Sequence, residues 1–280
     1  MFYSPRSEKD LVKILKDIDD NTYIIAGGTD LIIKLRNKKA IDYSILDITK
    51  LKEWKNIRED EKNIYIGSLV TMTELCESDL ICEKLPALYW AAHELGSTQI
   101  RNKATIGGNI SNASQSADTL LSLYAYDSEI KIVNGDSEEV VVSIEDFVTG
   151  REKTILKKDE AVKEIIIKKD DRMSTFQKVG SRKAVTISKV SCAVSLKIKD
   201  EIVNEVRVFL GAVGVKPVRA NLIEEVLLNK SLNEIDLELL YDASFNQVEM
   251  AIPTRASKYY KRVAIEGLME EILGDLINYG

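Results

Sequence analysis

The chain has 280 residues, of which 45% are hydrophobic and 30% charged, an ordinary globular composition with length enough for two or three compact units. Its net charge of −6 comes from interspersed acidic and basic residues. This argues against a nucleic-acid partner, which would favour a clustered basic face.

The first predicted unit covers residues 1–55. Ser7 can cap an amphipathic helix in which Leu11, Leu15 and Ile18 fall at helical spacing. A short apolar strand at residues 23–26 then ends at Gly27-Gly28, residues 31–35 follow, and residues 43–48 form a second buried strand. We interpret this segment as one lobe of a larger domain.

The second predicted unit covers residues 56–170. A helix capped by Thr71 follows a strand at 64–67, and a longer helix at 85–95 carries Pro86 in its first turn. Gly96 suits the end of that helix, and we expect the polar segment 97–118 to be a long loop. Strands are expected at 129–133 and 140–144, on either side of a turn.

After about residue 170 the pattern changes. Residues 174–179, 189–198 and 202–213 alternate apolar with polar side chains, as half-buried antiparallel strands do. Helices are expected at 219–228, 235–246 and 257–273. Strands followed by helices predict a separate C-terminal α+β domain at 171–280.

The turn at residues 26–31, Ala-Gly-Gly-Thr-Asp-Leu, follows directly on a buried strand. Paired glycines permit positive φ and remove Cβ, so successive backbone N–H groups can converge on an anion. Thr29 adds a hydroxyl donor. The alternative is an ordinary turn between a strand and a helix, because Gly-Gly is common there.

The polar segment 97–118 holds a second glycine pair, Gly107-Gly108, among many hydroxyl and amide donors. Ordering a long polar loop is costly unless something binds to it. Asp118 at its end can accept hydrogen bonds from the hydroxyls of a ribose. Alternatively, Asp118 caps a helix at 119–124, and both roles are compatible. Two glycine turns on one extended diphosphate explain these features better than a single phosphate loop, since neither turn matches G-x-G-x-x-G or G-x-x-x-x-G-K-[ST].

Side-chain chemistry is sparse. The chain has three scattered cysteines and no C-x-x-C, so we expect neither disulfides nor a metal or iron–sulfur site in this chain. Its one histidine, His93, lies on an apolar stretch and is expected to be a helix-surface or core residue. If the protein is an enzyme, a bound cofactor must supply its reactivity.

Five motifs in order resemble the FAD-binding subunits of the xanthine dehydrogenase and carbon monoxide dehydrogenase family. They cover nearly the whole chain: A-G-G-T-D-L at 26–31, I-R-N-x-A-T-I-G-G-N-I at 100–110 continuing into A-S-x-x-A-D at 113–118, F-x-x-G-x-x-x-T-x-L at 147–156, K-V-G-x-R-x-A at 178–184, and R-A-S-x-x-Y at 255–260. Gln115 stands where the family usually has proline, and no cysteine-rich insertion for an extra cluster is present.

The resemblance implies an α+β fold: a two-lobed FAD-binding domain of the vanillyl-alcohol oxidase (PCMH) type, followed by a C-terminal α+β domain. It implies FAD as the sole cofactor of this chain, with molybdopterin in a large partner subunit and two 2Fe-2S clusters in a small one. Substrate is then hydroxylated at molybdenum, and electrons pass through the clusters to FAD and on to an acceptor such as NAD⁺.

The resemblance also carries over cofactor-binding residues, with no side chain expected to be catalytic. Val162 and Lys178 match positions that flank the isoalloxazine, where a lysine can stabilise negative charge on the reduced flavin. The alternative for Lys178 is a surface residue on a strand. The expected FAD contacts are Ile25, Ala26, Gly27, Gly28, Thr29, Asp30, Leu31, Thr105, Gly108, Asn109, Ala113, Ser116, Asp118, Val162 and Lys178.

Two other functions stay open at this stage. A stand-alone flavin oxidase of the vanillyl-alcohol oxidase type needs an acid or base near the flavin, and no residue suggests itself. A nucleotide-binding protein without a redox role requires only the glycine turns. No stretch approaches the roughly 20 apolar residues that span a bilayer, and the N-terminal residues lack a signal-peptide pattern. We therefore expect a cytoplasmic protein with no membrane partner.

Overall fold

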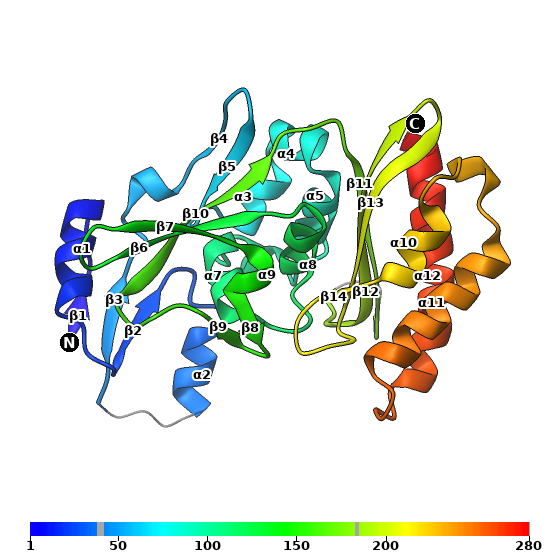
Figure 1. Cartoon of the computed structure of the whole chain (residues 1–280). Coiled ribbons are helices and arrows are strands. Elements are labelled where there is room, and N and C mark those ends of the chain that lie inside the picture. The colour runs from blue at the N-terminus through cyan, green and yellow to red at the C-terminus, as the bar shows by residue number, and fades with distance from the viewer. Residues whose placement is uncertain (38–41, 183–184, 280) are drawn as a thin grey trace. The chain divides into compact units, whose positions relative to one another are not determined.

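The computed structural model describes residues 1–37, 42–182 and 185–279 (Figure 1). The sequence motif at 178–184 ends on Lys183 and Ala184, which lie outside the described residues. Contacts along the chain define two compact units. The first comprises residues 1–74, 98–113 and 127–169, and the second comprises residues 75–97, 114–126 and 170–280. The predicted three-part division at 1–55, 56–170 and 171–280 stays a proposal.

The first unit contains two main sheets. A parallel sheet has the order β1-β3-β2, and an antiparallel sheet has the order β4-β5-β10-β6-β7. A two-stranded β8-β9 hairpin completes the described strands of this unit. The strands are β1 (Phe2–Tyr3), β2 (Thr22–Ile25), β3 (Ser44–Asp47), β4 (Ile57–Glu59), β5 (Asn63–Gly67), β6 (Glu129–Asn134), β7 (Glu139–Ser143), β8 (Val148–Gly150), β9 (Lys153–Thr154) and β10 (Glu160–Lys168).

The helices of the first unit are short, and the first of them is capped as expected. Ser7 accepts a hydrogen bond from the Asp10 N–H, and Leu11 and Leu15 are fully buried in a core with Trp54. The described helices are α1 (Glu8–Lys16), α2 (Leu31–Asn37), the 3₁₀ turn Lys52–Trp54, α6 (Thr98–Arg101), α7 (Ile106–Asn112) and α9 (Ile144–Phe147), while α3 (Met72–Cys76) crosses the unit boundary.

Two features of this region differ from the prediction. Much of segment 97–118 is helical, as α6 and α7, rather than one long loop, because Thr105 caps a helix whose glycines and polar residues give no apolar periodicity. The central strand β10 was missed because charged residues interrupt its apolar run. One of them, Glu164, is buried at 6% exposure and pairs with Lys131 and Arg58.

The second unit has an antiparallel sheet of order β11-β12-β13-β14. Figure 1 shows α10, α11 and α12 beside this sheet, and α10 and α12 pack against its strands. Helices α5 and α8 pack against the same strands. The elements are α4 (Asp79–Lys84), α5 (Pro86–His93), α8 (Asp118–Ala125), β11 (Met173–Gly180), β12 (Ser188–Lys199), β13 (Ile202–Gly211), β14 (Val218–Arg219), α10 (Asn221–Leu227), the 3₁₀ turn Leu232–Glu234, α11 (Leu237–Ala251) and α12 (Lys258–Tyr279).

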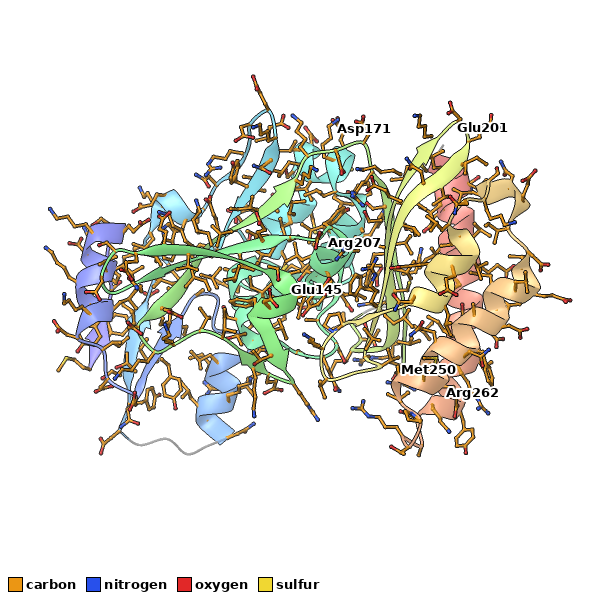
Figure 2. All side chains as sticks on the ribbon, viewed as in Figure 1. Glu145, Asp171, Glu201, Arg207, Met250 and Arg262 are labelled. Carbon is orange, nitrogen blue, oxygen red and sulfur yellow. The ribbon has the colours of Figure 1, made fainter. Side chains whose placement is uncertain are left out.

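The alternation predicted for the C-terminal strands explains how this sheet receives helices on both faces. Val190, Cys192 and Val194 share one hydrophobic core with apolar residues of α10, α11 and α12. The residues that alternate with these three lie on the opposite face of the sheet. On that face, Arg207 of β13 (Figure 2) donates a hydrogen bond to the Tyr124 carbonyl of α8 at 3.4 Å. Of the helices in the described part of the chain, none is long and apolar enough to cross a membrane.

Candidate functional site

The first glycine turn links β2 to α2. Gly28 has φ = +70°, a conformation that glycine adopts without the cost a Cβ would add. Residues 26–29 are half-buried, and no described residue accepts a hydrogen bond from the backbone N–H of Gly27, Gly28 or Thr29. The turn therefore presents three consecutive backbone donors, the arrangement from which anion-binding nests are built.

The two glycine segments, about 80 residues apart in sequence, are in direct contact within the first unit. A Cβ added to Gly27 would lie 1.9 Å from the Lys103 carbonyl oxygen and 3.1 Å from the Ala104 Cα. Only a residue without a side chain allows this approach. The structure thus brings together the two turns that the sequence suggested should act on one ligand.

The second glycine segment uses its backbone differently from the first. The Gly107 N–H donates to the Ser68 carbonyl at 2.9 Å, and the Gly108 N–H donates to the Thr105 hydroxyl at 3.1 Å. A Cβ on Gly107 would lie 2.7 Å from the Ser68 carbonyl oxygen. These glycines allow close packing, and their N–H groups are used within the protein. The polar surface of this segment is therefore formed by its side chains.

A polar cluster connects the helices that follow the two turns. Lys34 of α2 donates to the Asn112 side chain at 2.7 Å and to Glu152 at 2.9 Å. The Glu152 N–H in turn donates to the Ala113 carbonyl at 2.9 Å, where Ala113 adopts the left-handed conformation with φ = +46°. No motif singles out Lys34, and Glu152 occupies a variable position of the motif at 147–156.

Asp118 and Lys178 form a buried ion pair in the second unit. Lys178 Nζ lies 2.9 Å from Asp118 Oδ2, and the two side chains are 5% and 7% exposed. Lys178 also donates to the Glu94 carbonyl at 2.6 Å and to the Thr186 carbonyl at 3.5 Å. The prediction of a surface lysine as the alternative is wrong, because Nζ is enclosed by these acceptors.

Asp118 does not cap α8 as the alternative reading of the sequence proposed. It is the first residue of α8, Ala117 occupies the cap position, and the carboxylate turns to Lys178 and to Ser188 Oγ, which lies 2.6 Å from Oδ1. Burial raises the pKa of Asp118 above its ordinary value, and the Lys178 charge and the Ser188 hydrogen bond partly oppose that rise. Sequence reasoning missed Ser188, which carries no motif signal.

The remaining predicted contacts fall in both units. Val162 is buried on β10, a strand that packs against α7. The Ser116 N–H, in the second unit, donates to Ser114 Oγ at 3.3 Å.

His93 ends α5 with its ring 4.6 Å from that of Tyr89, which confirms a helix residue packed on its neighbours. Among the described residues, no group of three or more His, Cys, Asp or Glu side chains is arranged to hold a metal ion.

Comparisons with known proteins agree with these features. The family described as "FAD binding domain in molybdopterin dehydrogenase" matches residues 1–168, and "CO dehydrogenase flavoprotein C-terminal domain" matches residues 175–276. The chain is 30% identical over 290 residues to a nicotinate dehydrogenase FAD-subunit of Eubacterium barkeri, covering 99% of this chain and 96% of that protein. It is also 30% identical over 272 residues to a putative xanthine dehydrogenase FAD-binding subunit of Escherichia coli, covering 96% and 92%.

A solved structure supports the same fold. A chain of the carbon monoxide dehydrogenase from Hydrogenophaga pseudoflava superposes with a TM-score of 0.88 at 23% identity, covering 99% of this chain and 96% of that one. The expected α+β class, with an FAD-binding domain followed by a C-terminal domain, is therefore confirmed.

Proposed function

This chain belongs to the FAD-binding subunits of the molybdopterin dehydrogenase family, and from that premise we propose that it relays electrons through FAD. In this proposal the electrons come from 2Fe-2S clusters of a small partner subunit and leave to an acceptor such as NAD⁺. A large partner subunit holds the molybdopterin at which substrate is oxidised. The chain itself is an oxidoreductase subunit with FAD as its cofactor.

The contact between the two glycine segments carries this proposal. The first turn offers three N–H donors. It lies against the second segment at Gly27, where an added Cβ would clash with the Lys103 carbonyl oxygen. Neutral backbone donors suit a diphosphate in a chain whose basic residues are not clustered. The residues present therefore fit FAD, and we assign its diphosphate to residues 25–31 with Thr105, Gly108, Asn109 and Ala113.

The residues assigned to the rest of the cofactor are Ser116, Asp118, Val162 and Lys178. Asp118 keeps free lone pairs on both carboxylate oxygens, so it can accept hydrogen bonds from ribose hydroxyls while paired with Lys178. Lys178 supplies a buried positive charge, and Val162 supplies an apolar surface. When bound, the flavin provides redox chemistry that no side chain of this chain provides.

Adding FAD to the purified full chain tests the cofactor assignment. We expect flavin absorption bands that stay with the protein through gel filtration, and fluorescence quenching that saturates at one FAD per chain. A protein that retains no flavin would contradict both this proposal and a stand-alone flavin oxidase, and it would leave a nucleotide-binding role without redox chemistry.

Copurification from the native host tests the partners. Recovery of two further subunits, one with molybdopterin and one with 2Fe-2S clusters, is the expected result. Reduction of the complex by its substrate should then bleach the flavin bands, and adding NAD⁺ should restore them. A flavin-loaded chain that purifies alone and is reduced directly by a small substrate would instead favour the stand-alone oxidase.

A further inference from the structure

Ser188 points away from the side of the sheet that its position in β12 predicts. Side chains alternate along a strand, and Val190, Cys192, Val194 and Leu196 all face the core formed with α10, α11 and α12. Ser188 lies two residues before Val190 and should face that core too. Its hydroxyl instead lies 2.6 Å from Asp118 Oδ1, at the start of α8.

A β-bulge causes this change of side. Val179 of β11 pairs with Val190, but the next residue, Gly180, pairs with Ser188, so Lys189 is one extra residue on β12. An extra residue reverses the alternation beyond it. Ser188 therefore joins the face of Lys178, which pairs with Ser191, and both side chains reach Asp118.

The bulge gives each oxygen of Asp118 its own partner. Oδ2 accepts a hydrogen bond from the Lys178 ammonium at 2.9 Å, and Oδ1 accepts one from the Ser188 hydroxyl at 2.6 Å. Ser188 is 4% exposed, so water is poorly placed to replace its hydroxyl. Two fixed partners hold the carboxylate in one orientation, and a buried hydrogen bond to a charged group is among the stronger ones.

We propose that Ser188 is a positioning residue of the FAD site, aimed by the bulge at Lys189 and acting through Asp118. It holds the carboxylate oriented toward Lys178, which leaves the remaining lone pairs of Asp118 available to the cofactor. This inference rests on the function proposed above, in which Asp118 contacts FAD.

The effect has a signature in its pH dependence. Burial and the Glu94 carboxylate, which lies 3.9 Å from Lys178 Nζ, raise the pKa of Asp118, while the Lys178 charge and the Ser188 hydrogen bond lower it. Removing the Ser188 hydroxyl therefore raises that pKa further. Asp118 then becomes protonated at a higher pH and loses its attraction to Lys178. As the pH is lowered, FAD binding by the variant should therefore begin to weaken at a higher pH than FAD binding by the wild type.

The test measures FAD affinity of the full chain by flavin fluorescence across a pH series. Ser188→Ala should bind FAD about tenfold more weakly at neutral pH, as expected for one lost hydrogen bond to a charged group, with the acidic limb of the profile moved to higher pH. Ser195→Ala is the matched control. It removes a fully buried hydroxyl on the same strand and face, one with no hydrogen-bond partner among the described residues, and it should change neither the affinity nor the pH profile.

Two further variants separate positioning from packing. Ser188→Thr keeps the hydroxyl and should restore the affinity and the pH profile. In an Asp118→Ala background, Ser188→Ala should cause no further loss, because the side-chain acceptor of the Ser188 hydroxyl is gone. An undiminished loss in that background, or a threonine variant as weak as the alanine one, would overturn the inference.

The outcomes distinguish this inference from the function on which it rests. If the wild-type chain binds no FAD, the proposed function fails and the inference fails with it. If the wild type binds FAD and Ser188→Ala binds it equally tightly with an unchanged pH profile, the inference alone is wrong.

Discussion

The glycine turns of the first unit and the charged cluster of the second unit, both assigned to FAD in our proposal, are built in different ways. At Gly27 the missing side chain lets two backbone segments meet, and the polar groups offered are neutral N–H donors. At Asp118 and Lys178 the essential feature is a pair of buried opposite charges fixed by hydrogen bonds. The first arrangement depends on steric clearance and is insensitive to pH, whereas the second depends on charge and is sensitive to it.

Replacing Lys178 should have the largest effect on stability. Lys178→Met leaves the buried Asp118 carboxylate and the Glu94 carbonyl without the ammonium, and removing one partner of a buried pair costs about 3–5 kcal/mol. Denaturant unfolding monitored by circular dichroism measures this loss. Lys34→Met is the control from the first unit: its pair with Glu152 is half-exposed, so a much smaller loss is expected. Equal losses for the two lysines would contradict the distinction between buried and exposed charge.

Adding one methyl group at the first turn should have the next largest effect. In Gly27→Ala the new Cβ lies 1.9 Å from the Lys103 carbonyl oxygen, so one backbone segment must move. We expect the free energy of unfolding to fall by about 1–3 kcal/mol and FAD retention to be lost. Gly150→Ala is the control within the same unit, because no atom of the described residues lies within 4 Å of the added Cβ. A Gly27→Ala protein that binds FAD normally would remove the contact between the turns from the proposal.

The pH dependence of stability should separate the two arrangements. The folded-state pKa of Asp118 is raised above its ordinary value of 3.8. Its contribution to stability is therefore fully present below that value and is lost as the pH rises through the folded-state pKa. The difference in unfolding free energy between wild type and Asp118→Asn should fall over this window, by at most about 1.4 kcal/mol per pH unit.

The glycine turn provides the comparison for that titration. The difference between wild type and Gly27→Ala should stay constant over the same pH range, because no charge changes at the turn. A difference for Asp118→Asn that rises with pH would mean that Lys178 and Ser188 outweigh burial at this carboxyl.

Much of the fold followed from local signals. The Ser7 cap, Pro86 in the first turn of α5, and the alternating strands from β11 to β13 were all predicted, because caps and periodicity act within a few residues. Strand β10 and helix α7 were missed for the same reason. Glu164 is tolerated in β10 only because Arg58 and Lys131, distant in sequence, neutralise it, and the glycines of α7 contradict helix propensity.

The sequence by itself determined which residues are candidates for the cofactor. Its motifs singled out the two glycine pairs, Asp118 and Lys178, and their order along the chain indicated the family. Motifs are carried by residue type and spacing, which can be read without coordinates.

Only the tertiary structure decided what those residues do to one another. It places Gly27 against the Lys103 carbonyl, and it pairs Asp118 with Lys178 where the sequence had suggested a helix cap. A one-residue bulge places the Ser188 hydroxyl within hydrogen-bond distance of Asp118. Each of these depends on residues far apart in sequence, or on a register shift between strands, and neither leaves a local pattern because pairing and burial are set by the folded chain as a whole.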